Sequence, residues 1–414
     1  IIWMDSRSEK EFNYISESLG YDKYVRIAGA KPSVTFLPGK LLWLKNNEPH
    51  IFDNTYKFLQ TSSYINYKLT GRITMDIAQA SMSQAMDCRT LKWSDEIAAC
   101  TGIDLVSVMP EVFPVGEIIG EVSSSAASET GLKKGIPVVA GASDCMTAMY
   151  ATGIHKIGDG GESSGTTSMI FAGADRKSRP DAPVTTKPCD IPGMPYVFDA
   201  PLTATGASVE WFLNTAGKCL AEEAVKNRLN IFDHMNNTAS AVRAGSNGVL
   251  YYPYLQGERA PLWNSHARGM FIGLSVDTTV NDLARAVFEG TAYAIRHVVE
   301  AIRAEGAPVN SLRITGGGAK SRTWAKIKAS VLNVPVYLMD DKTGDVPFGG
   351  ALIAGRSVGI FKDFAQTIKE LAKPVEIIEP VREWTAYYDE VFPVFLSMYE
   401  HLDSDLKRFE GINR

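Results

Sequence analysis

An aspartate that follows a short apolar strand is the first residue of this sequence that could do chemistry. Asp144 comes after the apolar run Val138–Ala140 and the small residues of segment 141–143. A carboxylate at the carboxyl end of a strand faces the ligand crevice of an open α/β sheet, where it can accept a hydroxyl proton or lie near a metal ion. Asp also caps helices well, and we expect an apolar helix over Cys145–Tyr150. On position alone, we favour the cap.

Two glycine-containing segments could meet an anionic ligand. Small hydroxyl residues surround Gly165 in Ser164–Ser168, so backbone N–H groups there could meet phosphate oxygens; an ordinary hairpin turn is the alternative. Gly316–Gly318 stand between an expected strand and an expected helix, where close approach of a ligand is possible and the helix start favours anions. A tight turn that binds nothing is the alternative. Neither GxGxxG nor GxxxxGK(S/T) occurs, which excludes the usual dinucleotide and P-loop patterns.

Three further features favour structural roles. Segment 257–261 reads Gly-Glu-Arg-Ala-Pro, and we interpret its adjacent Glu and Arg as a structural ion pair. His297 lies on the apolar face of an expected helix and is interpreted as a core histidine. Trp3 could be a core aromatic residue or a platform for sugar stacking, and residue type does not decide between them.

The elements that would position these residues alternate between strands and helices, which is typical of an α/β fold. We expect strands over Ile1–Met4, Val138–Ala140, Met169–Ala172, Val249–Leu255, Leu312–Thr315 and Val336–Met339. We expect helices over Glu9–Leu19, Gly39–Asn46, Ser94–Cys100, Cys145–Tyr150, Gly206–Thr215, Asn281–Glu305, Thr323–Leu332, Gly349–Gly355 and Arg382–Phe409. Ile51–Leu69 is predicted as a strand followed by a helix, Gly158–Gly161 as a turn, and Asp175–Pro195 as a loop with short strands. The main domain boundary is predicted near residues 152–158.

Length and composition set outer limits on function. The 414 residues suggest two or three domains, and the net charge of −5 without a basic stripe argues against a nucleic-acid partner. Five scattered cysteines without a CxxC pair favour a reduced, cytoplasmic location. No HExxH or Cys/His zinc pattern is present, and no apolar run approaches the ~18 residues of a membrane helix.

Several segments, taken in order, resemble the FGGY family of carbohydrate kinases over essentially the whole chain. Gly269–Leu274, then seven residues, Asp282-Leu283, two residues and Ala286–Glu289 match the long FGGY signature at every specified position. Tyr254–Pro261 resembles the PYLxGER(A/S/T)P segment of the family, and Thr315–Ser321 resembles its adenosine loop. Gly344-Asp345 and Gly350-Ala351 resemble the segment that closes over the nucleotide.

This resemblance implies an α/β fold of two actin-like (ribonuclease H-like) ATPase domains with a cleft between them. Residues 1–154 would be the remainder of the N-terminal, sugar-binding domain. Residues 155–414 would be the C-terminal, nucleotide-binding domain, with a last helix able to pack back. A homodimer is compatible with this organisation.

The resemblance also implies site residues. Asp144 matches the catalytic base, which would also contact the substrate and the metal ion, and Trp3 and Asp5 match the sugar side. The positions that match nucleotide-binding segments are Gly165, Thr166 and Thr167 of the second phosphate loop, Gly206 and Glu210 near the phosphates and adenine, and Gly317, Gly318 and Arg322 of the adenosine loop. Ser168 stands where a glycine is frequent in the family.

The implied activity is ATP-dependent phosphorylation of a small sugar or polyol, with ATP and Mg²⁺ as cofactors. A xylulokinase-like member that converts D-xylulose to D-xylulose 5-phosphate is favoured. The alternatives are a gluconokinase, an erythritol or glycerol kinase, or a non-catalytic actin-like nucleotide-binding module. The family's opening Asp-x-Gly-Thr/Ser hairpin and its substrate motif do not occur here. We therefore expect an N-terminally truncated first domain, and no sugar-dependent ATP turnover by these 414 residues alone.

Overall fold

The computed structural model describes residues 1–2, 5–179, 181–340 and 346–412 and divides the chain into two compact units. The first unit contains residues 1–147, 178–190 and 346–364, and the second contains residues 148–177, 191–345 and 365–414. The change from the first unit to the second at residue 147 falls inside helix α10 (Asp144–Ala151). The expected domain division at residues 154 and 155 stays a prediction.

The first unit is built mainly from helices and short strands. Its helices are α1 (Glu9–Leu19), α2 (Tyr21–Ala28), α3 (Leu37–Asn47), α4 (Pro49–Asp53), α5 (Thr61–Thr70), α6 (Ile77–Met82), α7 (Asp95–Thr101), α8 (Leu105–Val108), α9 (Ser124–Thr130) and α16 (Val346–Ser357). Its strands are β1 (Thr74–Asp76), β2 (Met86–Asp87), β3 (Lys92–Trp93), β4 (Glu111–Phe113), β5 (Ile118–Glu121), β6 (Pro137–Val139) and most of β9 (Thr185–Ile191).

One apolar cluster joins the N-terminal helices of the first unit to its small sheets. Ile15 of α1 and Leu41 of α3 pack with Met75 of β1, and all three are buried. β1 pairs with β4 in parallel, while β5 and β6 form an antiparallel pair next to a smaller cluster around Ile119. Burial of this apolar surface is the main term that stabilises the unit.

The second unit contains one large mixed sheet, a separate two-stranded sheet formed by β11 and β12, and covering helices. Its strands are β7 (Gly158–Ser164), β8 (Ser168–Ala174), β10 (Met194–Leu202), β11 (Leu250–Tyr252), β12 (Met270–Ile272), β13 (Val309–Gly316), β14 (Val336–Met339) and β15 (Pro374–Ile378). Its helices are α11 (Gly206–Asn214), α12 (Lys218–Lys226), α13 (Ile231–Ala241), α14 (Val280–Ala304), α15 (Arg322–Leu332), most of α17 (Phe364–Leu371) and α18 (Arg382–Ile412), with 3₁₀ turns η1 (Ser246–Gly248) and η2 (Gly317–Lys320).

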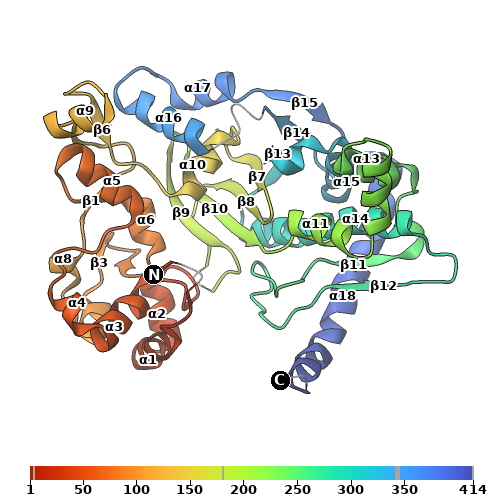
Figure 1. Ribbon diagram of the computed structural model, residues 1–414, viewed down its shortest axis with the longest axis horizontal. Coiled ribbons are helices and arrows are strands. Elements are labelled where there is room, and N and C mark those ends of the chain that lie inside the picture. Colours follow the sequence, from red (N-terminus) through yellow and green to blue (C-terminus); the bar gives the residue numbers. More distant parts are fainter. Residues whose placement is uncertain (3–4, 180, 341–345, 413–414) are drawn as a thin grey trace. The chain divides into compact units, whose positions relative to one another are not determined.

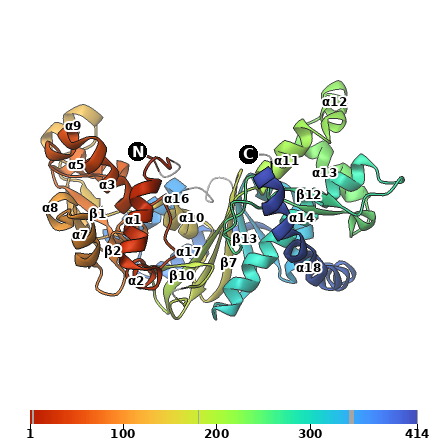
Figure 2. The same ribbon diagram turned by 90° about the horizontal axis from the view of Figure 1, so that it is seen from below.

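The order of strands within this unit's sheet is β15-β14-β13-β7-β8-β10. β13 runs parallel to both β14 and β7, whereas β8 is antiparallel to β7 and to β10. Helices α14 and α15 pack on each other and on the sheet, α14 over β8 and β10 and α15 over β14 and β15 (Figure 1). α11, α12 and α13 pack in succession along the chain (Figure 2). Because β7, β13 and β14 run parallel, the segments that follow them start at one edge of the sheet.

Helix α14 is the central helix of the unit, and the signature residues Asp282 and Glu289 have structural contacts at its start and on its buried face. Thr279 and Asp282 form a reciprocal capping box at its start, which satisfies N–H groups that the first turn leaves unbonded. Glu289 is buried and accepts hydrogen bonds from Gly245 N (3.0 Å) and Ser246 Oγ (2.8 Å). α18 packs beside α14, where the rings of Tyr293 and Phe395 lie 5.2 Å apart.

Most of the expected elements are confirmed, and two expectations are wrong. The expected strand at the start of Ile51–Leu69 is wrong, because Pro49 opens the short helix α4 there. The expected turn Gly158–Gly161 is wrong, because these residues belong to β7. A Cβ at Gly161 would lie 2.7 Å from Thr152 Oγ1, so this glycine permits close packing within a strand.

Residues 1 and 2 lie in neither a helix nor a strand, and the remainder of the expected strand Ile1–Met4 lies outside the described residues. The same holds for Gly344-Asp345 of the expected closing segment. Among the helices of the described ranges, not one combines the length and apolar character needed to cross a membrane.

Candidate functional site

The turn between β7 and β8 presents small residues at an exposed tip. Ser164 and Ser168 are paired at the end of the two strands, which leaves Gly165–Thr167 as the loop. All three loop residues are exposed, and Gly165 N donates to Thr167 O (2.9 Å). The turn is therefore an ordered hairpin tip, as both interpretations of this segment required.

The start of α11 packs directly against this tip. Ala207 N donates to Thr166 O (2.9 Å), and a Cβ at Gly206 would lie 2.2 Å from the carbonyl oxygen of Gly165. Only glycine fits so close to another backbone. Glu210 lies one turn further along α11 and is exposed.

The triple glycine lies beside the base of the same hairpin. Gly316, the last residue of β13, is paired with Ser164, and it has a φ of +78°, which favours glycine. A Cβ at Gly318 would lie 2.1 Å from Ser164 Oγ, so Gly318 is needed for internal packing. Gly317 is exposed, and the nearest atom to a Cβ there would be 3.9 Å away. Of these glycines, Gly317 is the one that is exposed without close packing against the hairpin, so an outside ligand has room beside it.

These segments form one feature of the second unit, which we call the glycine cluster: residues 165–167, 205–207 and 316–318. It lies where adjacent strands β7 and β13 end and where α11 begins. Backbone N–H groups and a helix start carry partial positive charge, which suits the oxygens of a phosphate chain. Thr205 precedes α11 without making a side-chain cap, so the first N–H groups of that helix are not bonded by that hydroxyl.

Arg322 opens helix α15, just after the triple glycine. Ser321 caps this helix by accepting from Trp324 N (3.0 Å). The guanidinium of Arg322 is exposed and pairs with Glu376 of β15. The structure therefore places Arg322 close in sequence to the glycine cluster, with its charge directed to a neighbouring strand.

Asp144 lies in the first unit, at the first position of α10. Its Oδ1 accepts from Cys145 N (2.7 Å), and the residue is exposed. The preceding Ser143 is buried, and its Oγ accepts from Met146 N (3.4 Å), which is the usual contact of a helix cap. Because Ser143 makes that contact, capping alone does not account for the carboxylate at position 144.

Asp5 forms a compact ion pair in the N-terminal segment. Arg7 Nε donates to both carboxylate oxygens of Asp5 (3.0 and 2.9 Å), and the hydrogen bonds from Arg7 hold the pKa of Asp5 below its ordinary value. The guanidinium of Arg7 lies 5.1 Å from the ring centre of Trp43. Trp3, the other residue expected on the sugar side, lies outside the described residues.

The Gly-Glu-Arg segment has a structural role that sequence reasoning described only in part. Glu258 Oε1 accepts from Thr203 N and Arg259 N, both at 2.8 Å, so the carboxyl group binds backbone. Burial raises the pKa of Glu258 to about 7. Thr203 lies just before α11, so Glu258 fixes the turn that leads into the glycine cluster. A Glu beside an Arg was the available signal, but its partner 55 residues away was not visible in the sequence.

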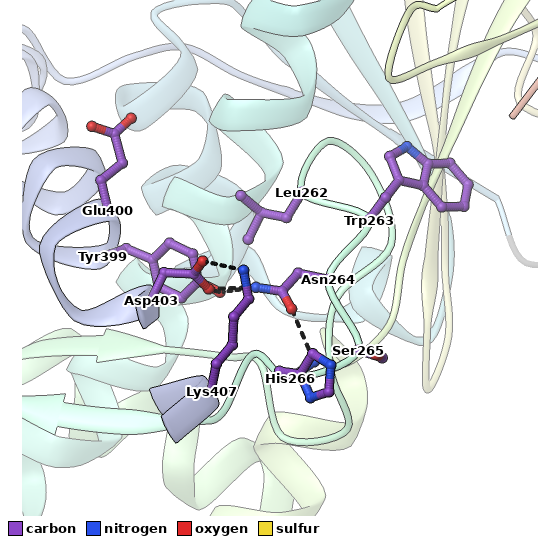
Figure 3. A pocket seen from close by; sticks show the side chains of 9 residues that line it. All are labelled: Leu262, Trp263, Asn264, Ser265, His266, Tyr399, Glu400, Asp403 and Lys407. Carbon is purple, nitrogen blue, oxygen red and sulfur yellow. Dashed lines mark hydrogen bonds and ion pairs between the residues drawn. The ribbon is translucent and has the colours of Figure 1, made fainter. Parts of the chain in front are cut away.

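A pocket of about 550 Å³ lies elsewhere in the second unit, between segment 262–266 and α18 (Figure 3). Its polar groups bind one another: Asn264 Nδ2 donates to Asp403 Oδ1 (2.5 Å), and Lys407 Nζ donates to Asp403 Oδ2 (2.7 Å). Trp263 points away from these side chains. The pocket contains no residue expected at the site.

Within the described ranges, no group of three or more His, Cys, Asp or Glu side chains is arranged to hold a metal ion. Mg²⁺ in phosphate-binding sites usually needs only one or two carboxylates, because waters and phosphate oxygens complete its coordination. The exposed carboxylate of Asp144 fits that limited requirement.

Comparison with known proteins gives consistent matches over both units. The model for the FGGY family of carbohydrate kinases, N-terminal domain, matches residues 1–151, and the model for the C-terminal domain of the same family matches residues 162–358. A xylulose kinase of Staphylococcus epidermidis is 28% identical over 405 residues, covering 97% of this chain and 77% of the relative. A gluconokinase of Bacillus subtilis is 25% identical over 417 residues, covering 100% and 80%. The crystal structure of xylulose kinase from Rhodospirillum rubrum is similar with a TM-score of 0.87 and 27% identity, covering 97% of this chain and 79% of that one.

Proposed function

Because this chain belongs to the FGGY family of carbohydrate kinases, we propose that it transfers the γ-phosphoryl group of ATP to a hydroxyl of a small sugar or polyol. Conversion of D-xylulose to D-xylulose 5-phosphate is the leading candidate reaction, because xylulose kinases are among its relatives in both sequence and structure. The presence of gluconokinases among those relatives keeps D-gluconate as the first alternative, and erythritol and glycerol follow.

The observation that carries this proposal is the glycine cluster. The hairpin tip 165–167, the start of α11 and the exposed Gly317 lie together at the ends of β7 and β13. Phosphoryl transfer needs positioning and charge stabilisation more than covalent help from the protein. Backbone N–H groups at these positions would bind the phosphates, while Glu210 and Arg322 would lie toward the adenosine.

Asp144 would act as the general base. It would accept the proton of the attacking sugar hydroxyl, a role for which its exposed carboxylate at the start of α10 is accessible. When bound with ATP, Mg²⁺ would offset the charge of the phosphate oxygens, and Asp144 is the residue proposed to contact it. Asp5 and Trp3 are proposed to contact the sugar.

The test is a coupled assay of ADP release with D-xylulose, D-gluconate, glycerol and erythritol as acceptors. It should be run on the 414-residue chain and on the product of its complete gene. We expect sugar-dependent turnover in the complete product, with D-xylulose as the best acceptor. ATP binding without turnover for any acceptor in either form would instead support a nucleotide-binding module.

The role of Asp144 can be tested against a matched residue in the same unit. Asp95 is also exposed, also opens a helix, and also follows a buried capping serine, Ser94. We expect Asp144→Asn to lower kcat by about 10²-fold or more while ATP binding is retained, and Asp95→Asn to leave kcat near its native value. Equal effects of the two substitutions on kcat would show that Asp144 acts only as a residue at a helix start and not as the general base.

A further inference from the structure

We propose that the buried ion pair Glu162–Lys328, acting through Ser168, is a positioning device that holds the hairpin tip 165–167 and the start of α11 together at the place proposed for the nucleotide phosphates. This inference rests on the proposed function, because it concerns how the same site is held ready. Glu162 and Lys328 touch no expected ligand, so they act through Ser168 and Thr205.

The pair is completely buried beneath the hairpin. Lys328 Nζ lies 2.7 Å from Glu162 Oε1 and 2.8 Å from Oε2, and both side chains have 0% exposure. Glu162 lies on β7, three residues before the hairpin tip, while Lys328 lies on α15, the helix that follows the triple glycine. The pair therefore links β7, which leads into the hairpin tip, to α15, which follows the triple glycine.

Ser168 extends this pair to the segment before α11. Its Oγ donates to Glu162 Oε1 (2.8 Å) and lies 2.8 Å from Thr205 Oγ1. A serine hydroxyl has one proton, and that proton is used on the carboxylate, so Thr205 must donate to Ser168. The result is a directed chain of hydrogen bonds from Thr205 through Ser168 to Glu162, which the charge of Lys328 stabilises.

This chain explains why α11 starts without a cap. Thr is one of the residues that normally cap a helix, yet Thr205 makes no such contact, because its hydroxyl is bonded to Ser168. In place of the missing cap, Ala207 N donates to Thr166 O of the hairpin tip (2.9 Å) and Ser208 N donates to Thr205 O (3.1 Å). The hydrogen bond from Thr205 to Ser168 therefore holds the helix start against the hairpin tip, and a helix start suits a phosphate group. Position 168 thus uses a hydroxyl where a glycine could not supply one.

Stability alone is a weak reason for such a pair. Apolar side chains of similar volume often stabilise a fold as well as a buried ion pair, because the charges must first lose their water. Burial lowers the pKa of Lys328, as expected for an ammonium that has lost its water, although Glu162 opposes the change. The ring of Trp324, 3.9 Å below the ammonium, provides a further fixed contact.

The first experiment compares Ser168→Ala with Ser330→Ala. Ser330 is an equally buried serine of α15 whose Oγ binds the backbone and not this network. We expect Ser168→Ala to raise the dissociation constant for ATP about 5- to 10-fold, with the KM for the sugar little changed. Both serine substitutions remove a buried hydrogen bond, so both should lower the unfolding temperature. Ser330→Ala should leave ATP affinity unchanged. Native ATP affinity in Ser168→Ala would overturn the inference.

The second experiment replaces the pair by apolar residues, Glu162→Leu with Lys328→Met. We expect a folded protein whose ATP dissociation constant rises at least about tenfold, because packing is replaced but the anchor of Ser168 is lost. A folded double variant that binds ATP like the native chain would contradict the proposal. If the double variant does not fold, Ser168→Ala alone decides. Failure of the proposed function would show differently, since the native chain would then release no ADP with any acceptor, whatever its affinity for ATP.

Discussion

The second unit contains two buried ion pairs that look alike but connect very different parts of the chain. The hairpin pair, Glu162–Lys328, and the signature pair, Arg285–Glu289, each have an N···O distance of 2.7 Å and almost no exposure. The signature pair lies within one helix, at positions i and i+4 of α14. The hairpin pair joins a strand to a helix 166 residues later.

Their outer partners differ as well. Glu289 binds the turn at Gly245 and Ser246, while Arg285 donates to Val242 O (2.9 Å) and to Tyr388 of α18 (3.0 Å). These contacts join helices and a turn, and none of them is to a residue of the glycine cluster. The comparison teaches that the sequence signature of the family marks the framework of this unit, whereas the hairpin pair and the glycine cluster lie outside the signature.

The largest effects should follow from removal of one partner of either pair. Lys328→Met and Arg285→Met each leave a buried carboxylate without its cation, so each should lower the free energy of unfolding by about 3–5 kcal/mol. Urea titration measures this. If removal of one partner lowers the free energy of unfolding by less than about 1 kcal/mol, that pair behaves like a surface ion pair, and the two pairs are not alike.

A medium effect, opposite in sign for the two regions, should appear with pH. Burial raises the pKa of Glu258, beside the turn into α11, to about 7, and burial lowers the pKa of His297, on α14, to about 4. The contribution of Glu258 is present below its ordinary pKa of 4.5 and is lost as pH rises to about 7. The contribution of His297 is present above 6.5 and is lost as pH falls to about 4.

Glu258→Gln and His297→Gln test these signs, because each amide cannot titrate. Relative to Glu258→Gln, the native chain should lose about 1–3 kcal/mol of stability between pH 5 and pH 8. Relative to His297→Gln, it should lose a similar amount between pH 6.5 and pH 4.5. Urea midpoints at four pH values suffice. Parallel pH profiles for the native chain and both variants would refute the assignment of either group.

The smallest effect on stability is expected at the exposed edge of the glycine cluster. Arg322 pairs with Glu376 at the surface, with side-chain exposures of 76% and 32%, so Arg322→Ala should change the free energy of unfolding by less than about 1 kcal/mol. If Arg322 contacts the adenosine, the same variant should raise the KM for ATP. Glu376→Ala is the control, because it removes the same ion pair but leaves the guanidinium. An unchanged KM for ATP in Arg322→Ala would show that this residue does not contribute to ATP binding.

The sequence predicted the individual elements better than their combination. Helix Glu9–Leu19 and strand Val336–Met339 have the predicted bounds, because apolar spacing and flanking turns act locally. The strand containing Gly160 and Gly161 was missed, because glycine marks turns unless a close neighbour demands it. A Cβ at Gly160 would lie 2.8 Å from Ser311 O, a contact between distant parts of the chain that the sequence does not reveal.

For the candidate site as well, the sequence predicted the separate segments but not the contacts between them. The hairpin tip, the start of α11 and the triple glycine were each noticed in the sequence, and the structure brings these three together in the second unit. Their catalytic and binding roles stay predictions, as do those of Asp144 and Asp5. The chain from Thr205 to Lys328 was missed, because spacing along a sequence does not reveal a hydrogen bond between a strand and a helix 166 residues apart.

The discontinuous first unit has a consequence for synthesis. Residues 346–364 belong to that unit, and within it Gly349 of α16 packs so closely on α10 that a Cβ would lie 1.9 Å from Thr147 O. A ribosome that has finished residue 147 must still make most of the second unit before α16 exists, a delay on the order of 10–40 s at ordinary elongation rates. During that time the surface that α16 will cover is exposed to solvent and to chaperones. The unit that begins first on the ribosome is therefore completed late, which makes slow translation of the middle of the gene a hazard for its beginning.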